Sequence, residues 1–407
     1  MPWSSGDSLN SYNLNWKWGG PIVSVLDPAY SADSSGAADS TASIEAAAAA
    51  VSVGGTLYFP PGVYRIDSTC DIRRGSIRID GGSRATLKVG SGTAGQLQIG
   101  SAGTYLSDVY VCGLNIDGST GSGYGISSWI SQNATFERIQ VYDVYDAGFV
   151  MSGASTWETN IFVRDISVIS TGGDGIRCNG NVQHAVVRDC FVKDTNQLAL
   201  GAAIASYATE IAVVNTRVVG ARDNGIRMTG VRCTAVNCVV TEWATDAYRI
   251  AADHCQVTSS SAYSSRDTSG AKHCIRIESG DFARVTGNEC RLGMNGVRIA
   301  SGHSHIITNN QISNQLSDGI NASDCTAVLI NGNSIFSCVR DGIRASSGSC
   351  ARFVVTSNIA GSCGSTGIRQ ASGASWLIAN NMCLDNAWSD ITYTAAAGIA
   401  SNVTMLP

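Results

Sequence analysis

The sequence has little charge and few prolines. Only 14% of its 407 residues are charged, against about 25% in an average globular protein. It has six prolines beside 45 glycines, and its net charge is −5. A nucleic-acid-binding protein needs a clustered basic face, so we expect no nucleic-acid partner. Low charge with abundant glycine favours short strands joined by tight turns.

Long hydrophobic runs are also missing. No stretch approaches the about 18 to 20 apolar residues that a membrane-spanning helix needs, so we expect no membrane insertion. The N-terminus, MPWSSGDSLNSYNLNWKWGG, has no basic start followed by an apolar run. We therefore expect no secretory signal peptide.

The 14 cysteines include no CxxC pair. Disulfide scaffolds are typically short secreted chains, and this chain is long. Several cysteines lie inside strand-like segments, where they act as small apolar side chains. We expect free thiols in the core, no zinc site, no other metal and no cofactor.

A repeat of about 23 residues is the strongest pattern in the sequence. Segments such as DGIRC, NGIRM, DAYRI and NGVRI each contain a central apolar residue. These apolar positions are Ile126, Phe149, Ile176, Ile204, Ile226, Tyr248, Ile275, Val297, Ile320, Ile343, Ile368 and Ile391. The period excludes helical repeats of about 33 residues or more. The alternation of apolar and polar residues within each segment predicts a half-buried strand. The sequence thus predicts an all-β, right-handed parallel β-helix. Each coil holds two or three short strands, and the coils lie about 4.8 Å apart.

A second row of residues runs in phase with the first. It consists of Asn115, Asn215, Asn237, Asn288, Asn310, Asn333, Asn358 and Asn381. Asparagine tolerates the left-handed backbone of tight corners, and stacked asparagines can bond to one another. Two such rows predict two sheets and two kinds of corner.

A helix is predicted before the coils, over residues 40–53. Asp39 or Ser40 can cap its start, and Gly54 and Gly55 follow its end. This short capping helix is expected to cover the open end of the solenoid. The expected organisation is an N-terminal leader (1–21), a segment with the capping helix (22–66), and the β-helix with a short C-terminal tail (67–407).

Residues 54–66, GGTLYFPPGVYRI, resemble the first segment of the pectate-lyase-like β-helix superfamily. That superfamily includes bacteriophage tailspikes, pectin hydrolases and lyases, and alginate epimerases. Residues 1–21 resemble the short virion-attaching leader of some tailspikes.

The resemblance implies a receptor-binding tailspike of the virion, made in the host cytoplasm and attached through its N-terminus to phage tail or baseplate proteins. Such a protein recognises a bacterial surface polysaccharide, and we expect it to depolymerise that glycan, by glycoside hydrolysis rather than by lyase chemistry. Two alternatives remain. One is a non-catalytic glycan-binding spike or adhesin, and the other is a free polysaccharide lyase or epimerase.

Acidic residues at the corners are the first catalytic candidates. Asp174 and Asp246 lie two residues before the repeated apolar position, and Asp223 lies three before it. The pectin hydrolases place catalytic Asp residues at this corner, but their Asp-Asp, Gly-His-Gly and Arg-Ile-Lys motifs are missing here. Asp-Gly is also a common turn pair. Asp223 and Asp246, about 5 Å apart on adjacent coils, would suit a retaining mechanism, and Asp174 and Asp223, about 9.5 Å apart, an inverting one.

Two glutamates in nearby coils complete the catalytic candidates. Glu210 lies near Tyr207, and Glu242 lies beside Trp243. A carboxylate beside an aromatic ring suits an acid next to a sugar platform, although the ring can equally cover a corner.

An arginine follows the repeated apolar residue in many coils. These residues are Arg177, Arg227, Arg249, Arg276, Arg298, Arg344 and Arg369. Guanidinium groups about 5 Å apart repel one another, so they need anions. Carboxylates of this chain, those of a partner subunit, or an acidic polysaccharide can supply them.

A third row of polar residues contains Asn133, Asn160, His184, Glu210, Arg232 and His254. It is expected to continue at Ala283, His305, Val328 and Phe353, and it is either a satisfied corner network or a binding patch. Loop insertions add Trp157, Glu158 and Tyr263. The expected substrate-binding residues are therefore Trp157, Glu158, His184, Tyr207, Arg227, Trp243, Arg249 and Tyr263.

The sequence predicts a homotrimer. Strands rich in Ala, Ser, Val and Ile present more apolar surface than a monomer usually exposes. The chain ends soon after its last coil, so subunits would associate along the coils. Light scattering at micromolar concentration should give about three times the chain mass of 42.4 kDa. A stable monomer would instead favour the free lyase or epimerase.

Overall fold

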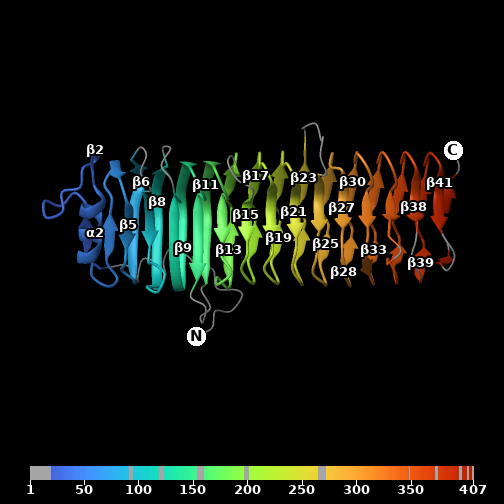
Figure 1. Cartoon of the computed structure of the whole chain (residues 1–407), viewed down its shortest axis with the longest axis horizontal. Helices are drawn as coiled ribbons and strands as arrows, with labels where there is room; N and C mark the ends of the chain where they lie inside the picture. Colours follow the sequence, from blue (N-terminus) through green and yellow to red (C-terminus); the bar gives the residue numbers. More distant parts are fainter. Residues whose placement is uncertain are drawn as a thin grey trace. The chain divides into compact units, whose positions relative to one another are not determined.

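The computed structural model describes residues 20–90, 95–118, 123–153, 160–196, 201–264, 272–347, 349–371 and 375–393, and the backbone of 397–400 and 403–405. Residues 1–19 of the predicted leader, and the loop residues Trp157 and Glu158, lie outside the described residues. The chain divides into two compact units, residues 1–167 and 168–407. Each unit by itself is a stack of parallel strands, so the predicted all-β parallel solenoid is confirmed (Figure 1).

The first unit stacks short strands and then longer ones. They are β1 (Ile22–Ser24), β2 (Ser35–Asp39), β3 (Thr56–Tyr58), β4 (Gly62–Ile66), β5 (Thr69–Ile72), β6 (Ile77–Val89), β7 (Gln96–Ile99), β8 (Leu106–Asp117), β9 (Ile126–Val144) and β10 (Phe149–Gly153). β6 pairs in parallel with β3 and β8, and β9 pairs with β7, β8 and β10. Strand β11 (Ile161–Thr171) contains the division between the units.

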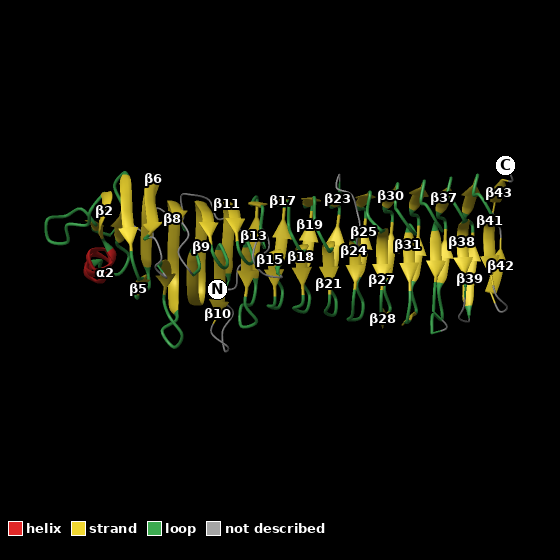
Figure 2. Cartoon of the chain, turned by 45° about the horizontal axis from the view of Figure 1, so that its top comes forward, coloured by secondary structure: helices red, strands yellow, loops and turns green. Residues whose placement is uncertain are grey.

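The helix predicted over residues 40–53 forms over Thr41–Ala50 (α2; red in Figure 2). Oδ1 of Asp39 accepts the backbone N–H of Thr41 at 3.0 Å, whereas the Ser40 side chain makes no cap hydrogen bond. Ile44 is fully buried, and the helix packs against β5 and β1. The predicted role of this helix as a cap of the solenoid stays a prediction.

The second unit builds each coil from three strands, one of the two numbers that the repeat length left open. The two sheets inferred from the two residue rows are therefore one too few. The first sheet, here called the Arg sheet, holds the repeated segments: β12 (Ile176–Cys178), β15 (Ala202–Ser206), β18 (Asn224–Met228), β21 (Asp246–Ile250), β24 (His273–Ile277), β27 (Asn295–Ile299), β31 (Ile320–Ala322), β35 (Ile343–Ala345), β38 (Thr366–Gln370) and β41 (Ser389–Tyr393). The three strands need a third corner in every coil, which the two residue rows alone do not reveal.

The other two sheets follow in chain order. The second sheet contains β13 (Ala185–Arg188), β16 (Ala212–Val214), β19 (Thr234–Val236), β22 (Gln256–Thr258), β25 (Arg284–Thr286), β29 (Ile306–Thr308), β33 (Leu329–Asn331), β36 (Val354–Thr356), β39 (Trp376–Ala379) and β42 (Ala397–Ala400). The third contains β14 (Phe191–Lys193), β17 (Arg217–Val219), β20 (Val239–Thr241), β23 (Ser261–Tyr263), β26 (Glu289–Arg291), β30 (Gln311–Ser313), β34 (Ser334–Phe336), β37 (Ile359–Gly361), β40 (Met382–Leu384) and β43 (Val403–Met405). A short pair, β28 (Gly302–His303) and β32 (Cys325–Thr326), lies beside them.

The repeated apolar residues form one interior column, as predicted. Ile226 is in register with Tyr248, Tyr248 with Ile275, Ile275 with Val297, and Val297 with Ile320. Each of these side chains is 0% exposed. All 14 cysteines are buried free thiols, as expected for small core side chains.

The asparagine ladder forms at the corner between the second and third sheets. Oδ1 of Asn310 accepts both the backbone N–H and the Nδ2–H of Asn288 at 3.0 Å, and the pattern repeats through Asn333, Asn358 and Asn381. Asn215 and Asn237, assigned to the same row from the sequence, occupy the preceding corner position instead. Their φ angles are 49° and 53°, because that position turns the chain and directs the side chain outward.

Val297→Asp should be strongly destabilising. Val297 is 0% exposed within its column, and a buried, unpaired carboxylate there should cost more than about 3 kcal/mol. Thermal unfolding followed by circular dichroism measures the loss, and Gln311→Asp, at an exposed position of the same coil, is the control. An unchanged Tm for Val297→Asp would place this side chain outside the core.

Candidate functional site

Strands of the Arg sheet begin with a bend that turns two successive side chains into the core. In β18 the second residue is Gly225, where a Cβ atom would meet Cγ1 of Val240 at 2.4 Å. The next residue, Ile226, is also buried, and the strand pairing skips Gly225. Asn224, which precedes this inward pair, and Arg227, which follows it, therefore lie together on the outer side of the sheet.

The bend creates two neighbouring outer rows along the Arg sheet. The polar row contains Asp174, Ala202, Asn224, Asp246, His273, Asn295, Asp318, Asp341, Thr366 and Ser389. The Arg row contains Arg177, Ala205, Arg227, Arg249, Arg276, Arg298, Asn321, Arg344, Arg369 and Thr392. The sequence predicted the Arg row, but alternation alone would put the polar row on the opposite face.

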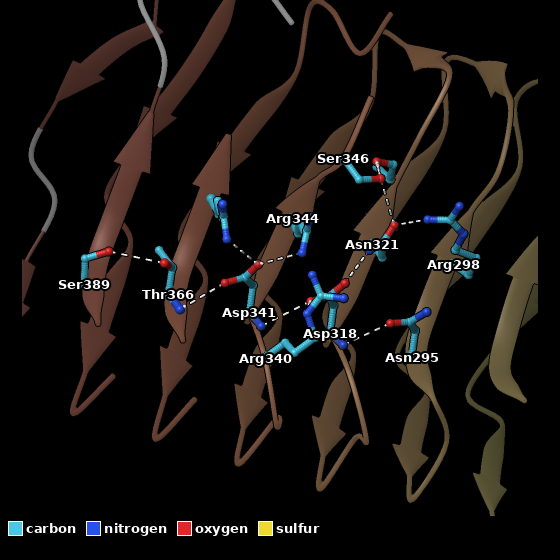
Figure 3. Close-up of polar contacts among 12 residues, drawn as sticks. Asn295, Arg298, Asp318, Asn321, Arg340, Asp341, Arg344, Ser346, Thr366 and Ser389 are labelled. Atoms are coloured by element: carbon cyan, nitrogen blue, oxygen red, sulfur yellow. Dashed lines mark hydrogen bonds and ion pairs between the residues drawn. The ribbon is translucent and has the colours of Figure 1, made fainter. Parts of the chain in front are cut away.

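Carboxylates of this chain neutralise many of the arginines. Nε of Arg177 donates to Oδ2 of Asp174 at 2.6 Å. Asp341 lies 3.5 Å from Arg344 and 3.8 Å from Arg369 (Figure 3). The anions that pair with these arginines are therefore carboxylates of this chain, the first of the three sources expected from the sequence.

In four coils a side chain of the polar row also accepts a hydrogen bond from the backbone of the next coil. Oδ1 of Asn295 accepts the N–H of Asp318 at 3.0 Å, and Oδ1 of Asp318 accepts the N–H of Asp341 at 3.2 Å. Oδ1 of Asp341 accepts the N–H of Thr366 at 3.0 Å (Figure 3). Asp174 does the same for Ala202 at 2.6 Å. These bonds satisfy polar groups that are buried from water.

The ladder is interrupted from Ala202 to His273, and this stretch includes Asn224 and Asp246. Both residues are 0% exposed. Among the described residues, neither the amide atoms of Asn224 nor the carboxylate oxygens of Asp246 have a hydrogen-bond partner. The N–H of His273, which Asp246 would bind in a regular ladder, donates to the carbonyl of Thr245 at 3.1 Å, although it still lies close enough to the Asp246 carboxylate to favour its charged form. A buried polar group left unpaired costs about 1–3 kcal/mol, so these adjacent coils hold unused binding capacity.

Burial raises the pKa of Asp246 to about 7, against the favourable charges of Arg276 and Arg249. Arg276 lies 3.9 Å from the carboxylate. Burial also lowers the pKa of the neighbouring His273 to about 4, so its ring is neutral at pH 7. A carboxyl group that titrates near neutrality can donate or accept a proton, as general acid–base catalysis requires.

The structure places the other catalytic candidates at different corners. Asp174 is 1% exposed and bound to Arg177, and Asp223 is 8% exposed in the corner that leads into β18. Glu242 lies at the equivalent corner before β21, with a φ of 58°. Glu210 lies at the other end of the Arg-sheet strands, in the corner before the second sheet. Asp174, Asp223, Glu242 and Asp246 thus lie along the corner that leads into the Arg sheet, and Glu210 does not.

Glu278 is a carboxylate that the sequence reasoning missed. It follows β24 and forms a two-point ion pair with Arg249, and it lies 3.5 Å from Arg276. Arg276 therefore joins Glu278 to Asp246. Glu278 lies three residues after the repeated Ile275, and this spacing is the signal that could have identified Glu278.

The aromatic candidates differ in exposure. Trp243 is only 1% exposed, so its ring fills the corner and offers no face to a sugar. Tyr207 is 38% exposed, and the Arg227 guanidinium lies 5.7 Å from the centre of its ring. Tyr263 is exposed but belongs to β23 of the third sheet, away from the Arg row.

The third predicted row is a corner column with a left-handed backbone. His184, Glu210, Arg232 and His254 have φ angles of 55° to 60°. Glu210 contacts His184 at 2.7 Å and Arg232 at 2.6 Å. The predicted continuation is wrong by one residue: the column continues through Phe282, Ser304, Ala327, Arg352 and Ser375. Ala283, His305, Val328 and Phe353 are buried, because the residue after each turn points inward.

Metal-binding clusters and membrane-spanning helices are both absent from the described parts of the chain. There, no group of three or more His, Cys, Asp or Glu side chains is arranged to hold a metal ion. No helix of these residues is long and apolar enough to cross a membrane.

Residues 224–402 match the family model described as "Right handed beta helix region". No curated protein matches the chain in sequence. Among solved structures, the catalytic unit of GH87 alpha-1,3-glucanase from Streptomyces thermodiastaticus strain HF3-3 is 15% identical, with a TM-score of 0.56 over 99% of this chain and 70% of that chain. DFA-IIIase from Arthrobacter chlorophenolicus A6, in complex with GF2, is 14% identical, with a TM-score of 0.53 over 78% of this chain and 94% of that chain.

A third similar structure is tailspike protein 3 of bacteriophage CBA120. It is 12% identical, with a TM-score of 0.48 over 95% of this chain and 62% of that chain. At these identities the similarity concerns the fold alone. The chain is therefore a parallel β-solenoid protein whose residues 224–402 match the right-handed β-helix region, and its resemblance to the β-helix superfamily is confirmed at the level of the fold.

Proposed function

We propose that this protein binds a bacterial surface polysaccharide and depolymerises it by glycoside hydrolysis on the outer face of the Arg sheet. The observation that carries the proposal is the interrupted ladder at Asn224 and Asp246. It leaves buried polar atoms without hydrogen bonds beside a carboxyl group whose pKa is raised to about 7. The glucanase with the same fold supports a reaction on a glycan.

Asp246 acts as the general acid in this proposal. Its protonated form would donate to the oxygen of the departing sugar, while Asn224 would hydrogen-bond a sugar hydroxyl group. Because Asp246 is 0% exposed, substrate binding must move the side chains above it. Arg249 and Arg276, whose side chains are 20% and 29% exposed, are the groups in reach of the solvent.

The second carboxylate is Asp223 or Glu278. The charge of Asp223 contributes to the raised pKa of Asp246, and Glu278 is joined to Asp246 through Arg276. Glycosidases place their two carboxyl groups about 5 Å apart for retention and about 6.5–9.5 Å apart for inversion. The anomeric configuration of the first product distinguishes the two arrangements.

The tailspike assignment is a further part of the proposal. It rests on the resemblance of residues 54–66 to the pectate-lyase-like β-helix superfamily, which includes tailspikes, and of residues 1–21 to the leader of some tailspikes. It implies a homotrimer on the virion that binds the host receptor and attaches to tail or baseplate proteins through residues 1–21. The remaining predicted binding residues Trp157 and Glu158 would add contacts from their loop.

Asp246→Asn should lower turnover at least about tenfold, because it removes the transferable proton. Reducing ends released from a panel of purified capsules and O-antigens measure turnover, with Glu289→Gln in β26 of the third sheet as the charge-matched control. Full activity of the Asp246 variant would place catalysis elsewhere. Glycan binding without any product would identify a spike or adhesin, and ultraviolet absorbance from an unsaturated uronate would identify a lyase.

The raised pKa of Asp246 also predicts a pH-dependent stability. The folded protein holds this proton more tightly than the unfolded chain does. The stabilisation is therefore complete below the ordinary pKa of 3.8 and is lost as the pH rises through about 7. Asp246→Asn stays neutral, so its Tm should exceed that of the wild type at about pH 8 and match it at about pH 4.

Glu289→Gln again provides the control. The difference between its Tm and that of the wild type should be the same at about pH 4 and at about pH 8. If the Tm of Asp246→Asn fell further below that of the wild type at about pH 8 than at about pH 4, the ionised carboxylate would instead stabilise the fold.

A further inference from the structure

We propose that the glycan bound on the Arg sheet is an acidic one, whose anionic groups pair with Arg227 and Arg298 on either side of Asp246. The inference rests on the proposed function, because it names the chemical class of the polysaccharide at that same site. It follows from the charges that the chain itself leaves unpaired in this part of the Arg row.

The outer face from β18 to β27 carries more positive than negative charge. Four arginines lie in register there on consecutive coils: Arg227, Arg249, Arg276 and Arg298. Among the described residues, the carboxylates within 4.0 Å of these guanidinium groups are those of Glu278 and Asp246. Burial raises the pKa of Asp246 to about 7, so this carboxyl group is partly protonated at neutral pH. Four positive charges thus face at most two negative ones.

Arg298 is held by neutral groups alone. Its guanidinium donates to Oδ1 of Asn321 (Figure 3) and, at 2.9 Å, to Oγ of Ser323. No carboxylate of the described residues lies within 4.0 Å of it. Burial and the charge of Arg276 lower the pKa of Arg298 despite the attraction of more distant carboxylates. A bound anion would stabilise the charged form of this side chain.

Arg227 is the second arginine without a carboxylate partner, again among the described residues. Its guanidinium lies 5.7 Å from the centre of the exposed Tyr207 ring. Its Nε is buried and has no hydrogen-bond partner in the described part of the chain. In other coils, by contrast, Asp174 pairs with Arg177, and Asp341 lies within 4.0 Å of Arg344 and Arg369. The two arginines that lack a carboxylate therefore lie beside the coils where the polar row lacks its hydrogen bonds.

An acidic glycan would supply the missing anions. A guanidinium group binds a carboxylate or a phosphate through two N–H groups, as Arg249 binds Glu278. Anions between coils about 4.8 Å apart would also relieve the repulsion among the arginines. A neutral glycan would instead cover the charges of Arg227 and Arg298 without pairing them, which costs free energy.

The test measures glycan binding to the Asp246→Asn protein by isothermal titration calorimetry, so that turnover does not consume the ligand. The probes are purified capsules and O-antigens, both acidic and neutral. At least one acidic polymer should bind, and the neutral polymers should bind at least about tenfold more weakly. Carbodiimide-activated reduction of the bound polymer converts its uronic acids to neutral sugars and leaves phosphates intact. Reduction should lower the affinity at least about tenfold if the anion is a carboxylate, and it distinguishes a carboxylate from a phosphate without any change in the protein.

Two substitutions in the same background locate the anions. Arg298→Gln and Arg227→Gln should each weaken binding of the acidic polymer at least about tenfold, because each removes a charge-assisted pair. Arg217→Gln is the charge-matched control, since Arg217 is exposed on β17 of the third sheet. This control should bind as the parent protein does, and circular dichroism confirms that the variants are folded.

Two outcomes would overturn the inference: failure of every acidic polymer to bind, or binding that Arg298→Gln and Arg227→Gln both leave unchanged. Cleavage of a neutral glycan that depends on Asp246 would also overturn it, while leaving the proposed hydrolysis intact. Conversely, an acidic glycan that requires Arg298 for binding but that the wild type never cleaves would support the inference and contradict the hydrolysis. The two failures are thus distinguishable.

Discussion

The bend at the start of each Arg-sheet strand is the constraint on which the outer face of the second unit depends. Two consecutive residues point inward there, which limits the first of them to a small side chain such as Gly225 or Ala247. The same bend brings the polar row and the Arg row onto one side. Without it, Asp174 could not contact Arg177 within its own coil.

Because the coils stack, each buried side chain of the polar row needs a hydrogen-bond partner from an adjacent coil or from an arginine. A carboxylate or amide in the polar row lies buried between coils, so it must bond to the next backbone N–H or to an arginine. Asp318 and Asp341 meet this requirement. Asn224 and Asp246 do not form these hydrogen bonds. Burying them without partners costs free energy, and a ligand that forms the missing hydrogen bonds would offset this cost. We therefore expect the binding site at the coils where the polar row lacks its hydrogen bonds to the next coil.

Much of the fold could be predicted from the sequence, because a residue that repeats once per coil marks an interior column directly. The column from Ile226 to Val297 and the ladder from Asn288 to Asn381 are of this kind. The third sheet and the placement of Asn215 could not be predicted, since neighbouring corner positions differ by one residue and tolerate similar side chains. Asp246 was identified as a candidate, but its unsatisfied state depends on contacts with other coils. Glu278 was missed because no other coil has an acidic residue three positions after its repeated apolar residue.

The central claim is that a glycan completes the hydrogen bonds missing at Asn224 and Asp246. The most direct measurement is a crystal structure of the Asp246→Asn protein with an oligosaccharide of its polysaccharide. The account predicts sugar oxygens within about 3 Å of the Asn224 amide and of the side chain at position 246, with Arg276 displaced. A structure in which protein atoms satisfy Asn224 and the sugar lies away from the Arg sheet would contradict it.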